Sequence, residues 1–395
     1  MTAPQDDLRF ALVGHGLMGA AHSQALRVAP AFFDLPRRPV MATLVGRDVD
    51  ATRAAASRWG WQRTESDWRA VLDDPTIDVV DICSPGATHV EIAVAALEAG
   101  KHVLCEKPLA NTVTEAERMA EAAAGAAQRG VFAMVGFSYR RVPAVTLARD
   151  VVAAGRIGDV RQVRAEYRQD WLVDADDPMT WRLDKAVAGS GALGDIGAHA
   201  VDAAQFVTGD RLTSVTGTLH TFVTERPLVD DSIVTSGLGG VAGSERGAVT
   251  VDDAAWLTGR FAGGALASVE ATRFATGRKN AFRVEVSGSR GAVAFDLERP
   301  NELELLESLE GDGPESGFRR VLVTEPEHPY VGAWWPAGHV LGWEHAFTHQ
   351  LRDLVVDLAA GRQPTPSFAD GLQVQRVLDA VERSDADGSR WTSVG

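Results

Sequence analysis

The chain has 395 residues, 45% of them hydrophobic, and a formal net charge of −15. This length favours two domains over one, and the acidic balance argues against a protein that binds nucleic acid non-specifically. Every apolar run is interrupted by charge or glycine well before the roughly 20 residues that a membrane helix needs, so we expect no membrane partner.

The first third of the chain alternates short apolar runs with alanine-rich segments of helical spacing. Strand and helix alternating at this rhythm indicate βαβ units around a buried parallel sheet. We therefore predict an α/β fold in which residues 1–139 form a doubly wound Rossmann domain. The predicted strands are 10–13, 40–45, 79–83, 102–105 and 131–135, and the predicted helices are 50–59, 89–99 and 113–129.

After about residue 140 the pattern changes to alternating polar and apolar residues, which predicts a large, mostly antiparallel sheet with one face open. We predict that residues 140–395 form an α+β domain for substrate binding and oligomerisation. A glycine- and serine-rich stretch at 236–247 predicts a mobile loop or hairpin tip, and 311–317 predicts a turn. The predicted strands are 160–167, 214–223, 254–261, 265–272, 282–287 and 293–296. The predicted helices are 143–154, 191–207 and 368–383, the last of which can pack back toward the first domain.

Two cysteines, Cys83 and Cys105, each end an apolar run and lack the spacing of a zinc site. The N-terminus carries acid where a signal peptide would be basic. We therefore expect a cytoplasmic protein with two reduced, buried thiols and no structural metal.

The segment GHGLMG at residues 14–19 directly follows the first predicted strand. It matches G-x-G-x-x-G in the context that a dinucleotide site requires, with a strand before it and a helix after it. The first glycine permits a tight turn, the second lets the backbone approach a pyrophosphate, and the third permits close packing of helix on strand. The alternative is a glycine-rich turn without a ligand. The predicted cofactor contacts are Gly14, Gly16, Leu17, Met18 and Gly19.

The end of the second predicted strand should read the adenine ribose. An Asp or Glu there favours NAD by bonding the 2′-hydroxyl. Here Gly46 occupies the usual acid position and Arg47 follows it, where an arginine can bind a 2′-phosphate or stack on adenine. Asp48 is one residue further along than the usual acid. The sequence leaves NAD and NADP both open.

Two further segments carry candidate chemistry. Glu106-Lys107-Pro108 follows the fifth predicted strand, at the edge of the sheet where ligands bind, although such a segment can also be a surface turn. Asp195 and His199 stand at i and i+4 of a glycine-led helix, a spacing that suits proton transfer. The alternatives for this helix are a capping Asp with an interior His, and a metal site completed by Asp202, which one helix rarely forms alone.

In this order, the glycine loop with His22 soon after it, Glu106-Lys107-Pro108 and the Asp195–His199 pair resemble the glucose–fructose oxidoreductase / inositol dehydrogenase / MocA family. The resemblance extends over essentially the whole chain. It implies a Rossmann domain followed by an α+β domain whose open sheet builds homodimers or homotetramers. It also implies hydride transfer between NAD or NADP and a secondary alcohol carbon of a sugar or cyclitol.

The resemblance also implies roles for single residues. Lys107 would hydrogen-bond the reacting oxygen and stabilise the developing alkoxide. His199 would be the general base in oxidation and the general acid in reduction, and Asp195 would hold substrate hydroxyls or orient His199. Glu106 would contact the ribose on the nicotinamide side. The other implied contacts are Ser84, Pro85, His89, Lys107, Trp181 and Arg182 for the cofactor, and Tyr139 and His339 for the substrate.

The substrate is indicated by later segments. Residues 250–253, 270–274 and 277–280 are similar to the levoglucosan dehydrogenase-like branch of the family, which implies oxidation of a pyranose such as levoglucosan at carbon 3. The aromatic run 334–339 fits a loop facing a sugar, or a tryptophan anchor under a loop. Three alternatives stay open: an inositol dehydrogenase, a reductase on the same fold, and a non-catalytic NAD(P)-binding sensor.

Overall fold

The structure is a computed structural model that describes residues 6–229, 242–307 and 313–395. The chain divides into two compact units. The first unit contains Met1–Ser138 and Glu344–Gln375, and the second contains Tyr139–Trp343 and Arg376–Gly395. The sequence prediction assigned everything after residue 139 to the second domain, whereas the chain returns to the first unit at Glu344 and leaves it again within the last helix.

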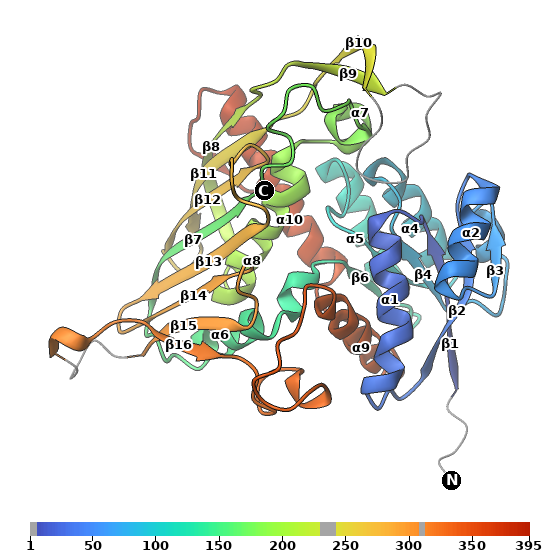
Figure 1. Ribbon diagram of the computed structural model, residues 1–395, viewed down its shortest axis with the longest axis horizontal. Helices are drawn as coiled ribbons and strands as arrows, with labels where there is room; N and C mark the ends of the chain where they lie inside the picture. Colours follow the sequence, from blue (N-terminus) through green and yellow to red (C-terminus); the bar gives the residue numbers. More distant parts are fainter. Residues whose placement is uncertain (1–5, 230–241, 308–312) are drawn as a thin grey trace. The chain divides into compact units, whose positions relative to one another are not determined.

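The first unit is built on a six-stranded sheet in the order β3-β2-β1-β4-β5-β6 (Figure 1). Each neighbouring pair of strands is parallel, and this order is that of the Rossmann fold. The central strands are buried, which explains their continuous apolar sequences. The elements are β1 (Asp7–Val13), α1 (Leu17–Phe32), β2 (Arg38–Val45), α2 (Val49–Trp59), β3 (Arg63–Glu65), α3 (Arg69–Leu72), β4 (Val79–Ile82), α4 (His89–Glu98), β5 (His102–Cys105), α5 (Val113–Ala127) and β6 (Ala133–Val135).

The returning segment adds to this unit in two places. Helix α9 (His345–Ala359) packs along α1. Beyond it the chain reaches the β6 edge, where the Val135 N–H donates to the Pro366 carbonyl at 2.9 Å and Met134 forms a bridge with Ser367. These contacts explain why residues 344–375 belong with the first unit.

The second unit is built on a nine-stranded sheet in the order β16-β15-β14-β13-β7-β12-β11-β8-β17 (Figure 1). All its strand pairs are antiparallel except β7 with β12, which confirms the predicted mostly antiparallel sheet. The elements are α6 (Pro143–Ala153), β7 (Val160–Arg168), α7 (Lys185–Ala188), a π-helix (Leu193–Gly197), α8 (Ala198–Thr208), β8 (Leu212–His220), β9 (Glu225–Val229), β10 (Ala242–Ala248), β11 (Ala254–Phe261), β12 (Leu266–Thr272), β13 (Ala281–Gly288), β14 (Ala292–Asp296), β15 (Glu302–Leu306), β16 (Arg319–Leu322), α10 (Phe368–Ala386, entering from the first unit) and β17 (Thr392–Ser393).

The two faces of the large sheet differ in character. Helices α6 and α8 pack on one face, against β7, β12, β13, β14 and β15. The side chains on the other face are exposed, so that exposed and buried residues alternate along each strand. In β11, for example, Trp256 is 41% exposed and its two chain neighbours are buried. This alternation is what the sequence pattern predicted for a sheet covered on one side.

Two predicted loops are only partly described. Of the stretch 236–247, residues 236–241 lie outside the described residues, while Ala242–Ala248 form strand β10, which pairs with β9. Of the turn 311–317, the described part includes a short 3-10 turn at Gly313–Glu315. Within the described ranges, the helices are all too short or too polar to span a membrane.

Candidate functional site

The glycine loop of the first unit is shaped by its own backbone. Gly14 has a φ of +103°, and a Cβ added to it would lie 2.8 Å from the Cys83 carbonyl oxygen. A Cβ on Gly19 would overlap the Gly14 carbonyl oxygen. A Cβ on Gly16, in contrast, has no protein atom within 4 Å. Packing therefore requires glycine at positions 14 and 19, while Gly16 leaves an open backbone surface that a ligand can approach.

Helix α1 presents its N-terminus at this loop. The helix begins at Leu17 with Gly16 as its N-cap, and neither a capping side chain nor an acidic residue occupies its first turn. Its first N–H groups and the positive end of the helix dipole therefore suit an anion. Leu17 is 56% exposed and Met18 is half-buried beside it. These features fit the pyrophosphate of a dinucleotide.

The end of β2 explains the missing acidic residue. A Cβ on Gly46 would lie 2.5 Å from the His15 ring and overlap the Thr52 hydroxyl, so a larger side chain there requires both of these side chains to move. The Asp48 carboxylate is bound at the start of α2, where it accepts the Ala51 N–H at 2.9 Å. Arg47 is exposed. The residue that follows Gly46 therefore presents a positively charged side chain, that of Arg47, to solvent.

The segment after β5 holds Glu106 and Lys107. Glu106 is 5% exposed, and Lys107 is half-buried and joined to Pro108 by a cis peptide bond. One Glu106 oxygen, Oε2, accepts the Lys107 backbone N–H at 3.2 Å. The other, Oε1, lies 3.1 Å from His22 Nε2. The carboxylate that the sequence assigned to the cofactor ribose is thus held inside the protein on both of its oxygens.

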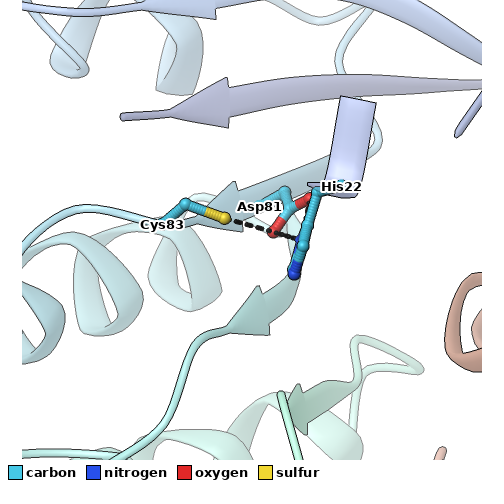
Figure 2. A group of neighbouring side chains, drawn as sticks. All are labelled: His22, Asp81 and Cys83. Atoms are coloured by element: carbon cyan, nitrogen blue, oxygen red, sulfur yellow. Dashed lines mark hydrogen bonds and ion pairs between the residues drawn. The ribbon is translucent and has the colours of Figure 1, made fainter. Parts of the chain in front are cut away.

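Figure 2 shows the His22 ring beside the Asp81 carboxylate, with Cys83 next to them. His22 Nδ1 lies 2.9 and 3.0 Å from the two Asp81 oxygens. Burial disfavours the imidazolium, but the Asp81 carboxylate outweighs it and raises the pKa of His22 well above its ordinary value. The sequence analysis used His22 only as part of a family pattern and did not identify this bridge, because Asp81 and Glu106 are remote in sequence.

The same cluster could be taken for a metal site, since ligand atoms of His22, Asp81 and Cys83 lie within 4.8 Å of one another. Two observations favour an ion bridge. Burial raises the pKa of the Cys83 thiol far above its ordinary value, so the thiol stays protonated and is a poor metal ligand. Both ring nitrogens of His22 already face carboxylates.

His89 also proves to be an interior residue, at 2% exposure. Its Nε2 lies 2.9 Å from the Ser84 carbonyl oxygen, and its Nδ1 lies 3.1 Å from the Pro108 carbonyl oxygen. Burial lowers its pKa, and a neutral ring donates to only one of these two carbonyl oxygens. His89 therefore lies between the loops that follow β4 and β5. Ser84 and Pro85 belong to the loop after β4 and are both half-buried.

In the second unit the glycine-led helix begins with a π-helical turn, Leu193–Gly197, which carries Asp195. The regular α-helical spacing predicted for Asp195 and His199 is therefore wrong, because Asp195 lies in a π-helical turn. Single π-helical turns are frequent at functional sites. The turn is fixed from below by Asp252, whose carboxylate accepts the Gly191 N–H at 2.7 Å and the Leu193 N–H at 2.8 Å.

A buried arginine faces Asp195. The Arg273 side chain is fully buried, and its Nη1 lies 3.7 Å from Asp195 Oδ2. Its Nη2 donates to the Asp252 carbonyl oxygen at 3.0 Å. Arg273 was not among the predicted site residues, although it lies in the segment 270–274 that indicated the family branch. Arg273 therefore places a positive charge beside the Asp195 carboxylate.

His199 lies at the start of α8 and is 8% exposed. Its ring stacks on Tyr139, with centroids 4.6 Å apart and an angle of 27° between the planes. Tyr139 was predicted to face the substrate. In the structure it is 6% exposed, and its hydroxyl lies 2.8 Å from that of Tyr167 and accepts the Trp343 Nε1–H at 3.1 Å. Tyr139 therefore orients the histidine ring rather than standing open.

Tyr167 continues this polar chain. Its hydroxyl donates to Asn280 Oδ1 at 2.7 Å, so the Tyr139 hydroxyl donates to Tyr167. Burial and the neighbouring Tyr139 raise the pKa of Tyr167 well above its ordinary value. A tyrosinate base is therefore disfavoured, which leaves His199 as the better proton acceptor in this cluster.

The remaining predicted residues have other surroundings. Asp202, the third member of the metal alternative, accepts a two-pronged ion pair from Arg140, with Nε at 2.9 Å and Nη2 at 2.5 Å. Arg182 stacks on Trp181, its Cζ 4.4 Å from the ring centroid. His339 is exposed, and its Nδ1 lies 2.8 Å from the Pro336 carbonyl oxygen.

A Rossmann unit with an open anion site, joined to an α+β unit with a buried histidine beside a carboxylate and an arginine, defines a nicotinamide-dependent oxidoreductase. The chain belongs to the GFO/IDH/MocA family of oxidoreductases. The family model for the NAD-binding Rossmann fold matches residues 8–137, and the model for the GFO/IDH/MocA C-terminal domain matches residues 145–294. This confirms the resemblance, the fold class and NAD as the cofactor of the fold.

Several relatives are similar over nearly their full length. The levoglucosan dehydrogenase of Pseudarthrobacter phenanthrenivorans is 41% identical over 98% of both chains. The inositol 2-dehydrogenase of Rhizobium meliloti is 27% identical over 96% of this chain and 97% of its own. A solved levoglucosan dehydrogenase in complex with NADH and levoglucosan is 40% identical, with a TM-score of 0.91 over 98% of this chain and all of its own. An oxidoreductase domain protein from Kribbella flavida is 58% identical, with a TM-score of 0.93 over 99% of this chain.

Proposed function

We propose that this protein is an NAD-dependent dehydrogenase that oxidises the secondary hydroxyl at carbon 3 of a pyranose such as levoglucosan. The observation that carries the proposal is the full-length similarity to a levoglucosan dehydrogenase solved with NADH and levoglucosan. In this chain Lys107, Asp195 and His199 supply the side chains that such a reaction needs. An inositol is the second candidate substrate, supported by the similarity to inositol 2-dehydrogenase.

In the proposed reaction, the alcohol carbon gives its hydride to the nicotinamide ring of NAD and its hydroxyl proton to the protein, which leaves a ketone. Lys107 hydrogen-bonds the reacting oxygen and stabilises the negative charge that develops on it. His199 accepts the hydroxyl proton through its imidazole and returns it in the reverse direction. Asp195, held beside Arg273, binds substrate hydroxyls. Trp181, Arg182 and His339 remain candidates for contacts with cofactor or sugar.

We further propose that NAD is preferred over NADP. The levoglucosan dehydrogenase complexes contain NADH. At the adenosine end, the His15 ring lies beside Gly46, where many NAD-binding sites carry an acid. The exposed Arg47 gives NADP a weaker route of binding.

The test is a spectrophotometric screen at 340 nm with NAD and NADP separately, against levoglucosan, glucose, simple glycosides and inositols. We expect reduced cofactor with levoglucosan and NAD, and a lower kcat/KM with NADP. Turnover confined to inositols would transfer the assignment to the second candidate. Bound cofactor in a calorimeter without turnover on any compound would support a sensor instead.

We also propose that the open face of the large sheet joins copies of this chain into a homodimer or homotetramer. Trp256 and Leu266 are 41% and 45% exposed on this face, beside a hollow of about 430 Å³ lined by β7, β8, β11 and β12. Exposed apolar groups gathered on one face are typical of interfaces. Sedimentation should show a dimer or tetramer at micromolar concentration, and Trp256→Asp should dissociate it. A wild-type monomer under these conditions would refute this assembly.

A further inference from the structure

His22 connects three elements of the first unit. It projects from α1, the helix that begins at the glycine loop, and lies beside Asp81 of β4 (Figure 2). The ring is 4% exposed and also contacts Glu106, which follows β5. Its Nδ1 faces Asp81 and its Nε2 faces Glu106 Oε1 at 3.1 Å. A neutral imidazole carries a single N–H, so only the imidazolium can donate to both carboxylates at once.

The groups packed around the ring are consistent with that charge. Asp81, Glu106 and the Cys83 thiol face it from the sheet, and the Phe347 ring of α9 lies 5.6 Å away. The pKa of His22 is well above its ordinary value, because the Asp81 carboxylate outweighs the effect of burial. Buried ion bridges of this kind contribute little stability compared with apolar packing, and they cluster at functional sites.

Glu106 has no freedom to move away from this bridge. A Cβ added to Gly136, at the end of β6, would lie 2.7 Å from Glu106 Oε1 and 3.3 Å from the Glu106 Cα. The carboxylate is therefore packed between Gly136 and His22. Its second oxygen accepts the Lys107 backbone N–H at 3.2 Å.

We propose that His22 is a positioning residue for Lys107: by bridging Asp81 and Glu106, it fixes the carboxylate that holds the Lys107 backbone in place. This inference rests on the role proposed above for Lys107. It adds a physical link, through one buried side chain, between the helix of the phosphate loop and the lysine that acts on the substrate oxygen. His22 touches neither substrate nor cofactor in this account.

Two substitutions separate a positioning role from a merely structural one. A glutamine at position 22 keeps an N–H near the place of Nε2, toward Glu106, whereas an asparagine keeps one near the place of Nδ1, toward Asp81 only. We expect His22→Asn to lower kcat about tenfold or more, the cost of losing one hydrogen bond to a charged group. We expect His22→Gln to retain most of the activity. A purely structural role would lower the melting temperature of both and leave kcat equal.

The position of Lys107 can be measured without any substrate. The chain has four lysines, Lys101, Lys107, Lys185 and Lys279, so reductive methylation with ¹³C-formaldehyde gives few NMR signals. The Lys107 signal is assigned by its absence from Lys107→Arg. In His22→Asn this signal should move while the other three stay, and in His22→Gln it should move much less. Ser23→Ala is the control, because Ser23 is a buried polar neighbour on α1 that bonds Gly19 and Trp61 and does not touch Glu106.

Every outcome decides the proposal. If folded His22→Asn leaves the Lys107 signal in place, or if the Gln and Asn variants behave alike, His22 does not position Lys107. If His22→Asn fails to fold, Gly136→Ala presses on the same carboxylate from the opposite side, and an unmoved Lys107 signal there overturns the proposal. An inactive wild-type protein would contradict the proposed function alone, since the NMR result stands without turnover.

Discussion

Lys107→Ala is expected to reduce kcat by about 10²- to 10³-fold, the usual cost of removing one preorganised donor from a developing oxyanion. The binding constant for NADH should stay within about tenfold of the wild-type value, because glycine-loop contacts dominate cofactor affinity. Steady-state rates and a NADH fluorescence titration measure the two quantities on the same preparation. The combination of lost turnover and retained cofactor is what distinguishes a catalytic lysine from a binding one.

Lys101→Ala is the matched control. Lys101 lies in the same unit, and its Nζ donates to the carbonyl oxygens of Asp74 and Ile77 at 2.7 and 2.9 Å. Its loss should lower thermal stability and leave kcat nearly unchanged. Lys107→Ala with near-normal turnover would refute the role assigned to Lys107.

His199→Asn is expected to lower kcat by about 10²- to 10⁴-fold, because proton transfer in the transition state loses its acceptor. The asparagine keeps a polar side chain against Tyr139, so the fold should survive. The limb of the pH–rate profile that reports the general base should disappear in the variant. Rates measured across pH, on levoglucosan or whichever sugar the screen identifies, test both points.

His220→Asn serves as the control for this change. His220 lies on β8 of the same unit, at the exposed edge of a contact with Phe222, and has no role in the proposed chemistry. Its kcat should equal that of the wild type. A His199→Asn enzyme that keeps its rate and its pH profile would point to a different base.

Much of the fold could be predicted because its sheets leave clear patterns in sequence. Strands buried on both faces give continuous apolar runs, as in Val79–Ile82, and a sheet covered on one face gives alternation, as in Ala254–Phe261. The glycine loop was predictable because Gly14 and Gly19 leave no room for a side chain. Strands and the glycine loop can thus be predicted from local sequence because neighbouring residues alone determine their patterns.

Features that depend on distant partners were not predicted. Helix α9 has buried residues at helical spacing, among them Phe347, Leu351, Leu354 and Leu358, so a signal for the helix existed. Its membership of the first unit depends on packing against α1, some 300 residues earlier, which no local pattern records. The His22 bridge and the Arg273–Asp195 pair are missing from the prediction for the same reason.

The site residues also differ in whether their surroundings depend on residues that are distant in sequence. The roles predicted for Lys107 and His199 remain proposals. Glu106 and His89 are different, because the sequence indicates their presence at the cofactor loops but not that both point inward. Only the packing of Gly136 against Glu106, and of His89 between two carbonyl oxygens, shows that they support the site from within.

The reaction proposed for this protein is hydride transfer from carbon 3 of a pyranose to NAD. The most direct test is to incubate the enzyme with NAD and levoglucosan that carries deuterium only at carbon 3, and to determine the mass of the reduced cofactor. We predict NADH that is heavier by one deuterium. Reduced cofactor of ordinary mass would show that another carbon is oxidised, and the absence of reduced cofactor would contradict the proposed substrate.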